Sequence, residues 1–422
     1  MNQKYLRFFL VPVIVALSLI LFFSFSLVHN ERTSELLTNK DLDAAKVGLQ
    51  EGKNLNYSIL WLTSFQDYLS RMDRFYYDLI EASFENYEGR REVWGPGFEG
   101  YKEELSIDEN IKQHFGDYCK EFDAIYSSLY HWSVKACGKT LQIHEFGDCN
   151  FRGCFNEYNQ FGNITIGRYA NEIMAIFNQE TMKNKSMHLF AHNPDCANEK
   201  IFFSNRFEDR KQAAVVFGAI SDTWYPLRYK IFHGIKKGKI KANIYEHPGY
   251  NFLPNNVDEI PKVYIRNSAF LRNHRQQQID YANAMKDSKI CIFDSSIMKK
   301  AIRKFMEASL AGCVVASDIP LDLYPDLSKF IIELDASQSE EEIDNTIQYY
   351  LNNPHLLKQK ATMAQNFALQ HFTCKSKFDR IILFDREYRK GRRGYFFPFG
   401  FAFDCFSLGN PNGDTWICPG NN

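Results

Sequence analysis

Short apolar segments rich in β-branched and aromatic residues alternate with amphipathic segments of helical length along most of the chain after Asn56. This alternation is the strongest constraint on the fold. Strands that are separated by helical crossovers pair in parallel, and a parallel sheet must bury both of its faces. The sequence therefore predicts an α/β fold with crossover helices.

The alternating pattern runs through the chain twice, with a break near residues 205–211. In the first unit, strands are expected at 58–63, 92–94, 122–126, 141–145 and 187–191, and helices at 70–84, 108–115 and 169–177. In the second unit, strands are expected at 213–220, 242–246, 289–293 and 313–317, and helices at 226–235, 280–285, 300–310, 340–351 and 354–371.

Two such units predict two Rossmann-like domains that face a cleft, since ligands bind at the carboxyl ends of parallel strands. The first domain is expected at residues 53–210 and the second at residues 211–378. Residues 379–422 follow as a C-terminal helix and an aromatic tail. The tail contains many phenylalanines without a usable period.

An uninterrupted uncharged segment at residues 8–28 precedes both domains. At about 1.5 Å per residue it is long enough to span a hydrocarbon layer of about 30 Å. Lys4 and Arg7 precede this segment, whereas charges of both signs follow it, so residues 1–7 should stay in the cytosol. We expect a single-pass type II membrane protein with a stem at residues 29–52 and a body in the lumen of the Golgi or endoplasmic reticulum. A cleaved signal peptide is the alternative.

Composition narrows the classes of partner. The formal net charge is -1, so no overall field draws nucleic acid to the surface. Three acceptor triplets for N-glycosylation begin at Asn56, Asn163 and Asn184, and they agree with a lumenal glycoprotein. A small anionic ligand would need a local cluster of basic residues.

The ten cysteines contain no CxxC pair, which argues against a zinc ribbon or a thioredoxin-type motif. In an oxidising compartment, the strongest candidates for disulfides are Cys137, Cys149, Cys154 and Cys196. Buried free thiols are the alternative. No metal site is predicted.

The expected helix at 300–310 carries the most informative polar residues. At helical spacing Lys299, Arg303 and Glu307 share one face. A ligand that contains a diphosphate and a ribose needs cations for its phosphates and a carboxylate for its ribose hydroxyls. Arg303 or Lys304 suits the first task and Glu307 suits the second. An ordinary solvated helix face is the alternative.

Residues 288–378 contain the segments SKICIFDSS, RKFMEASLAGCVVASDIP and YYLNNPHLLKQKATMAQNFALQHFT. These segments resemble the C-terminal domain of group 1 glycosyltransferases of the GT-B fold, in particular the spore-maturation glycosyltransferase-like branch. The resemblance implies a nucleotide-sugar donor, with Glu307 at the ribose and Arg303 or Lys304 at the phosphates, and no required cofactor. Many group 1 enzymes have a second glutamate eight positions earlier, where this chain has Lys299. Retention of anomeric configuration therefore does not follow.

Arg228 and His247 complete the expected donor site. Pro226 fits the first turn of a helix, which places Arg228 near a helix N-terminus, where a diphosphate is attracted. His247 follows the strand at 242–246, in a turn that can contact the base or the ribose. The alternatives are a surface arginine after a proline cap and a solvated turn.

Three titratable residues, His144, Glu145 and Asp148, lie at the end of the expected strand 141–145. We expect this strand end to face the cleft, where any of the three can serve as the base that deprotonates an acceptor hydroxyl. A solvated, non-catalytic turn is the alternative.

These features predict a membrane-anchored glycosyltransferase that moves a sugar from a nucleotide-sugar donor to a glycan or glycoconjugate acceptor. The membrane contact is residues 8–28, and nucleic acid is not an expected partner. Lys299 motivates the alternative, a catalytically silent glycosyltransferase-like protein that binds glycans or acts as a scaffold. A secreted carbohydrate-binding protein is a weaker alternative.

Overall fold

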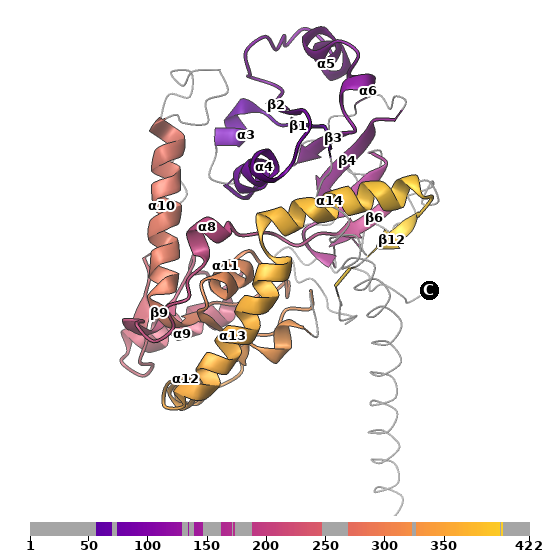
Figure 1. The fold of residues 1–422 in the computed structure, drawn as a ribbon. Helices are drawn as coiled ribbons and strands as arrows, with labels where there is room; N and C mark the ends of the chain where they lie inside the picture. Colours follow the sequence, from indigo (N-terminus) through magenta and orange to yellow (C-terminus); the bar gives the residue numbers. More distant parts are fainter. Residues whose placement is uncertain are drawn as a thin grey trace, which may run out of the picture.

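Two parallel β-sheets divide the protein into an N-terminal and a C-terminal half, which lie above and below one another in Figure 1. The computed structural model describes residues 56–69, 74–128, 134, 139–146, 162–170, 172–173, 188–246, 269–322, 326–396 and 398–399. Within these ranges no helix is both long enough and apolar enough to cross a membrane. The expected anchor at 8–28 and the expected stem at 29–52 lie outside the described residues.

The N-terminal half is built on a seven-stranded sheet whose strands all pair in parallel. In spatial order its strands are β12 (Gly394–Phe396), β6 (Leu189–His192), β5 (Ile164–Gly167), β4 (Leu141–Phe146), β3 (Ala124–Ser128), β1 (Ile59–Leu62) and β2 (Arg91–Trp94). The helices of its first part are α3 (Phe65–Leu69), α4 (Arg74–Asn86), α5 (Ile107–Phe115) and α6 (Tyr118–Glu121). Strands β1, β5 and β6 are buried at every position, as expected for a sheet that is covered on both faces.

The C-terminal half contains a five-stranded sheet, also parallel throughout. Its strands in spatial order are β11 (Ile332–Glu333), β10 (Val314–Ser317), β9 (Ser288–Ile292), β7 (Gln212–Val216) and β8 (Asn243–Ile244). Its helices are α8 (Glu199–Phe202), α9 (Pro226–Lys236), α10 (Ala269–Lys286), α11 (Lys304–Leu310), the 3-10 helix η6 (Leu327–Lys329), α12 (Glu340–Leu351) and α13 (Pro354–His371).

Both sheets reverse their strand order once. In the C-terminal sheet, the chain moves from β7 outward to β8 and then returns to form β9 on the other side of β7. In the N-terminal sheet the same reversal lies between β1 and β3. In open α/β sheets, ligands bind beyond the carboxyl ends of the strands at such a reversal. The fold therefore points to the ends of β7 and β9 as a binding site.

The chain crosses between the halves twice. After β6 it enters the C-terminal half through α8, and after α13 it returns as α14 (Cys374–Arg389), which packs on α4 of the N-terminal half (Figure 1). A disulfide between Cys196 and Cys374 joins the two crossings. Beside it, the Ala197 amide donates to the Phe372 carbonyl at 2.9 Å. The two crossing segments therefore lie side by side.

Cys196 forms a disulfide, as the sequence predicts, but its partner is Cys374, which was not among the expected cysteines. Cys374 lies 178 positions later in the chain and reaches Cys196 because α14 returns to the N-terminal half. A second disulfide joins Cys291 of β9 to Cys313, the residue before the neighbouring strand β10. The other expected disulfide cysteines, 137, 149 and 154, lie outside the described residues.

Most of the expected strands and helices are present. The expected helix 70–84 is found as α4, which covers residues 74–86, and residues 70–73 lie outside the described residues. Two expectations need correction. The sequence did not predict β5, β11 or β12. The expected helix 300–310 begins only at Lys304, because the preceding turn places Ser296 and Lys299 at φ values of 65° and 51°. Lys299 is therefore not on a common helical face with Arg303 and Glu307.

A buried group of four charged side chains attaches α14 to the N-terminal half. The Lys377 Nζ lies 3.0 Å from Glu145 Oε1 and 3.7 Å from Asp195 Oδ1. The Arg168 Nε lies 3.0 Å from the same Glu145 oxygen. Burial lowers the pKa of Lys377, although Glu145 and Asp195 oppose this shift. Two positive and two negative charges balance, so removal of one member leaves an uncompensated charge in the interior.

Substitution of Lys377 by methionine should lower the free energy of unfolding by about 3–5 kcal/mol, because Glu145 and Asp195 would then share a single cation. Urea unfolding of the full-length protein, followed by circular dichroism, measures this loss. The control is Lys390→Met at the end of the same helix, where the side chain is 70% exposed and its removal should change little. Equal losses in both variants would show that the buried charges do not hold α14.

Candidate active site

Charged side chains gather beyond the carboxyl ends of β7 and β9, where the strand order reverses. Beyond β7, Gly218 adopts a φ of +104°. A Cβ atom on this glycine would lie 2.5 Å from Arg228 Nη1 and 2.8 Å from Lys304 Cε. Helices α9 and α11 thus bring two cations against one glycine, at the place where the topology predicts a ligand.

Arg228 is almost fully buried, with 1% of its surface exposed. It lies in the first turn of α9, which begins at Pro226 as the sequence predicts. Its Nη2 donates to Asp294 Oδ1 at 2.8 Å and its Nη1 donates to the Ala219 carbonyl at 2.7 Å. The guanidinium carbon also lies 4.1 Å from the centre of the Tyr225 ring. These contacts hold the arginine in one orientation, while its contact with a diphosphate stays a prediction.

Asp294, directly beyond β9, is the carboxylate that faces Arg228. Burial raises the pKa of Asp294 and the neighbouring Asp318 adds to this shift, whereas Arg228 and Lys304 oppose it. Arg228 and Lys304 therefore act on the same carboxylate from two helices. The edge of the sheet carries both signs of charge rather than cations alone.

Asp318, which follows β10, shapes the turn that precedes α11. Its carboxylate accepts hydrogen bonds from the Ser295 amide at 2.7 Å and from the Ser295 hydroxyl. Lys299 Nζ lies 2.7 Å from Asp318 Oδ2. Lys299 therefore neutralises a buried carboxylate of its own half. This contact and the left-handed backbone explain why Lys299 leaves the polar face expected for α11.

Glu307, on α11, is 5% exposed. Its Oε1 lies 2.9 Å from Arg303 Nε. The Arg303 Nη2 donates to Asp78 Oδ2 on α4 at 2.9 Å. Arg303 is thus shared between carboxylates of the two halves, whereas Lys304 is the α11 cation that reaches Gly218. Of the predicted donor residues, Arg228 and Lys304 both lie beside Gly218, Arg303 pairs with Glu307, and His247 lies outside the described residues.

The expectation that the end of β4 faces a cleft is wrong for His144 and Glu145. They are 2% and 1% exposed, because β4 is an interior strand of a sheet that is covered on both faces. The His144 Nδ1 lies 3.1 Å from Ser127 Oγ. Glu145 accepts a hydrogen bond from Tyr126 and belongs to the buried charged group with Lys377. Asp148 lies outside the described residues, and the use of any of these residues as a base stays a prediction.

Sequence reasoning missed Gly218, Asp294, Asp318 and Asp78. The two aspartates near the C-terminal sheet follow expected strands directly, and that position is a usable signal. Gly218 fell inside an expected strand, which hid its role in a turn. Asp78 gives no signal, since its partner Arg303 is 225 positions away.

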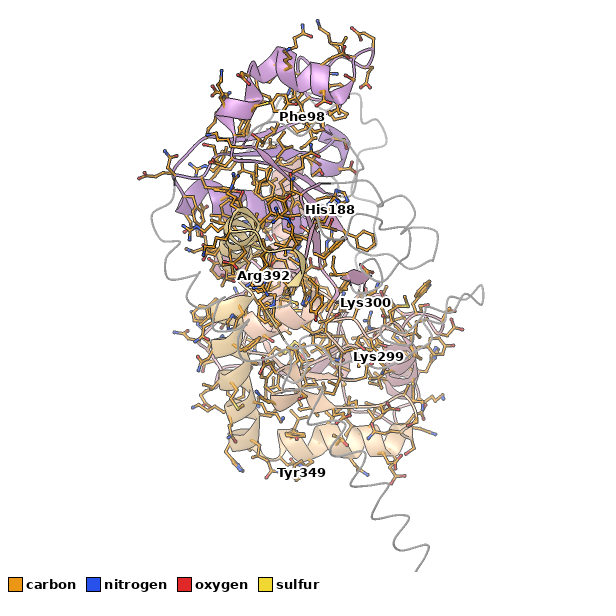
Figure 2. All side chains as sticks on the ribbon, turned by 90° about the vertical axis from the view of Figure 1, so that its right-hand side faces the viewer. Phe98, His188, Lys299, Lys300, Tyr349 and Arg392 are labelled. Atoms are coloured by element: carbon orange, nitrogen blue, oxygen red, sulfur yellow. A yellow bond between two sulfur atoms is a disulfide. The ribbon has the colours of Figure 1, made fainter. Side chains whose placement is uncertain are left out.

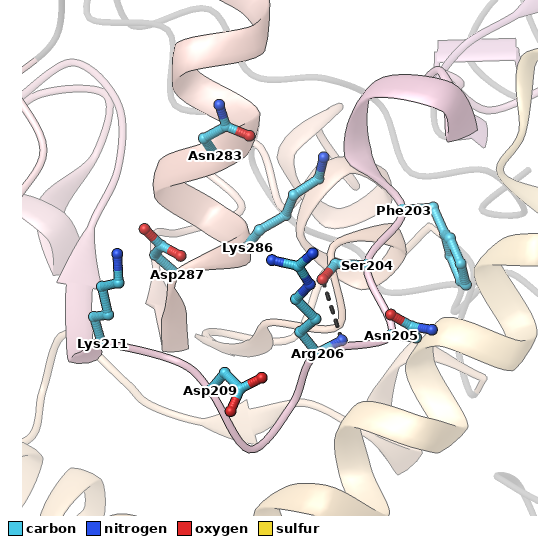
Figure 3. Close-up of a pocket in the computed structure, with 9 residues that line it drawn as sticks. All are labelled: Phe203, Ser204, Asn205, Arg206, Asp209, Lys211, Asn283, Lys286 and Asp287. Atoms are coloured by element: carbon cyan, nitrogen blue, oxygen red, sulfur yellow. Dashed lines mark hydrogen bonds between the residues drawn. The ribbon is translucent and has the colours of Figure 1, made fainter.

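A cavity of about 670 Å³ lies at the opposite end of the C-terminal sheet (Figure 3). Lys211 and Asp287, which line it, directly precede β7 and β9. The cavity is therefore at the amino ends of the strands, and the four predicted donor residues that the structure describes, Arg228, Arg303, Lys304 and Glu307, do not line it. Among the described residues, no group of three or more His, Cys, Asp or Glu side chains is arranged to hold a metal ion.

Comparison with known proteins agrees with this geometry. Residues 256–382 match the family model described as glycosyl transferase-like. No curated protein matches the chain. A glycosyltransferase from Rickettsia africae has a similar structure, with a TM-score of 0.50, 12% sequence identity, and coverage of 80% of this chain and 100% of that one.

Two further structures resemble the chain more weakly. HepE of Anabaena, in complex with UDP and glucose, has a TM-score of 0.46 and 11% identity, and the match covers 77% of this chain and 98% of that one. Sucrose-phosphate synthase from Thermosynechococcus elongatus has a TM-score of 0.47 and 9% identity, with coverage of 80% and 100%. The likeness to the Rickettsia africae structure shows that the chain shares an α/β fold with parallel sheets with a glycosyltransferase, and the matched domain at residues 256–382 is of the glycosyl transferase-like family.

Substitution of Gly218 by alanine should destabilise the protein by about 2 kcal/mol, because a side chain is strained at this φ and its Cβ would displace the Arg228 guanidinium. The control is Gly238→Ala, since Gly238 also has a positive φ, of +71°, but no atom lies within 4 Å of the position that its Cβ would take. It should lose only about 1 kcal/mol. Urea unfolding of both variants measures the difference, and equal losses would contradict the close contact between Gly218 and Arg228.

Proposed function

We propose that this protein is a glycosyltransferase that transfers a sugar from a nucleoside diphosphate sugar to a glycan or glycoconjugate acceptor. The observation that carries the proposal is the meeting of Arg228 and Lys304 at Gly218, at the reversal of strand order between β7 and β9. Two cations that meet at the carboxyl end of β7 suit a leaving diphosphate, whose charge must be stabilised as the glycosidic bond breaks. The donor would therefore bind beyond these two strands.

In this proposal Arg228 and Lys304 contact the diphosphate. Glu307 accepts hydrogen bonds from the ribose hydroxyls, and His247 contacts the base or the ribose. Arg303 serves the donor through its ion pair with Glu307 rather than through the phosphates. Of the three predicted acceptor bases, we propose Asp148, because Glu145 and His144 are buried in the N-terminal half. No cofactor or metal is required by these roles.

The same proposal includes the finer assignments from the sequence. The chain would belong to the spore-maturation glycosyltransferase-like branch, with residues 8–28 as a membrane anchor and the body in the lumen of the Golgi or endoplasmic reticulum. The disulfides Cys196–Cys374 and Cys291–Cys313 support an oxidising compartment.

N-glycosylation belongs to this proposal as well. Asn56 is exposed and suits a glycan. The Asn163 side chain instead accepts a hydrogen bond from the Gln142 amide at 2.8 Å and donates one to the Tyr388 hydroxyl at 3.2 Å. We therefore favour Asn56 over Asn163 as a modified site.

A catalytically silent glycan-binding or scaffold protein is the second candidate, and the observation that favours it is Lys299 at the position of the missing glutamate. Transfer or hydrolysis of any sugar nucleotide by the purified protein would exclude this candidate. Nucleotide binding without turnover would favour it. The two candidates therefore differ in turnover, not in binding.

Thermal denaturation of the full-length protein with UDP, GDP, ADP and TDP tests the proposed site. At least one nucleotide should stabilise the protein, by about 2.7 kcal/mol at a concentration of 100 times its Kd. Glu307→Ala should weaken that nucleotide by about 10- to 100-fold, because a charged hydrogen bond contributes about 1.5–3 kcal/mol. Isothermal titration calorimetry measures the affinity.

The matched control is Glu341→Ala, on the exposed first turn of α12, which should leave the affinity unchanged. A protein that none of the four nucleotides stabilises would argue against the proposed function. Equal effects of the two glutamate variants would remove Glu307 from the site but would leave nucleotide binding itself intact.

A further inference from the structure

We infer that Asp78 of the N-terminal half is a positioning residue for the donor site, which acts through Arg303 on Glu307. The inference rests on the proposed function, because it assigns to Asp78 a part in the binding of the donor ribose. It goes beyond that function by making the contact between the two halves a requirement for a correctly oriented Glu307. Asp78 itself does not touch the donor.

Asp78 is fully buried within α4. Its carboxylate accepts hydrogen bonds from residues outside the N-terminal half. Arg275 and Gln278 of α10 both donate to it, Gln278 at 2.7 Å. Arg303 donates at 2.9 Å. Asn198, at the start of α8, adds a longer contact at 3.4 Å. The Asp78 carboxylate thus contacts α10, the start of α11 and the crossing segment at the start of α8.

The charge of Asp78 is stabilised by these partners. Burial alone raises the pKa of this carboxyl, but the coulombic effects of Arg275 and Arg303 and the Gln278 hydrogen bond outweigh it, and the net shift is downward. Asp78 is therefore ionised at neutral pH. A neutral residue of the same shape would leave two arginines without the carboxylate that they share.

Charges of opposite sign alternate along a chain of five side chains at this interface. Glu81 lies 3.0 Å from Arg275, Arg275 pairs with Asp78, Asp78 pairs with Arg303, and Arg303 lies 2.9 Å from Glu307. Glu307 is the end of this chain. Among the described residues its only ion pair is the one with Arg303.

Arg303 lies between the two carboxylates. Its Nη2 donates a hydrogen bond to Asp78 Oδ2, and its Nε lies 2.9 Å from Glu307 Oε1 as an ion pair without the directed geometry of a hydrogen bond. Asp78 therefore holds the guanidinium in place, and the guanidinium holds its positive charge beside Glu307. Loss of Asp78 frees the Arg303 side chain, and the charge that positions Glu307 moves with it.

The segment that leads into α11 is tied to the N-terminal half at a second place. Lys300 Nζ lies 2.6 Å from Glu172 Oε1, and both side chains are buried. Asp322 accepts from the amides of Ala170 at 2.7 Å and Ala301 at 2.9 Å, one in each half. Figure 2 shows Lys300 where the two halves meet. These contacts therefore fix the N-terminus of α11 relative to the N-terminal half.

Calorimetric titration of the full-length protein with UDP, in single and double variants, tests the inference. Asp78→Asn should weaken UDP binding by about tenfold, within the usual range for coupled sites. In a Glu307→Gln background the same substitution should cause no further loss, because residues that act through one another are not additive. A purely structural defect would lower affinity equally in both backgrounds.

Two more variants distinguish a loss of Glu307 orientation from misfolding and from general effects of substitution in α4. Arg303→Lys keeps the charge but cannot reach both carboxylates from one planar group, and it should reproduce the loss of Asp78→Asn. Glu85→Gln, on the same helix, removes an exposed ion pair with Lys200 and should leave UDP affinity unchanged.

The possible failures are distinguishable. Binding that depends on Glu307 but not on Asp78, or an affinity that rises in Asp78→Asn, would overturn the inference and leave the proposed function intact. Equal losses in the two Glu307 backgrounds would also overturn it. A wild-type protein that does not bind UDP or the other three nucleotides would remove the proposed function and the inference with it.

Discussion

The buried ion pair between Lys377 and Glu145 determines how the whole chain is assembled. Lys377 lies near the end of the chain, 232 positions after Glu145, and neither charge can be left alone in the interior without a cost of several kcal/mol. Helix α14 must therefore dock on the N-terminal sheet. Once it docks, the two crossing segments meet, and Cys196 and Cys374 come within bonding distance. The C-terminal half is then attached at both of its ends.

The two attachments fix the ends of the C-terminal half. The side chains at the interface then determine how the two halves are placed relative to each other. The contacts are mostly charged: Asp78 binds arginines from two elements, and Glu172 binds Lys300. The turn that carries Lys300 leads directly into α11, on which Lys304 and Glu307 lie. The interface and the candidate donor site therefore share one short segment, and a shift in one cannot leave the other unchanged.

The sequence predicted the two parallel α/β units because each strand is a local apolar segment that needs no distant partner to be recognised. It missed β11 and β12, which have only two and three residues and depend on a neighbour for their existence. It also placed Glu145 at a cleft, since the Lys377 and Arg168 side chains that bury it are remote in the sequence. Within the site, Arg228 was found from a local proline signal, whereas Asp78 becomes visible only when the two halves are in contact.

The lysine at position 299 has a physical explanation that does not require loss of activity. Asp318 is 6% exposed, and it accepts hydrogen bonds from the amide and the hydroxyl of Ser295 to form the turn before α11. Lys299 supplies the positive charge that this carboxylate needs. A glutamate at 299 would bring a second negative charge toward Asp318, and the repulsion would oppose the turn that presents Lys304 and Glu307. The departure from the paired-glutamate pattern is thus a local consequence of Asp318, and by itself it does not indicate a silent protein.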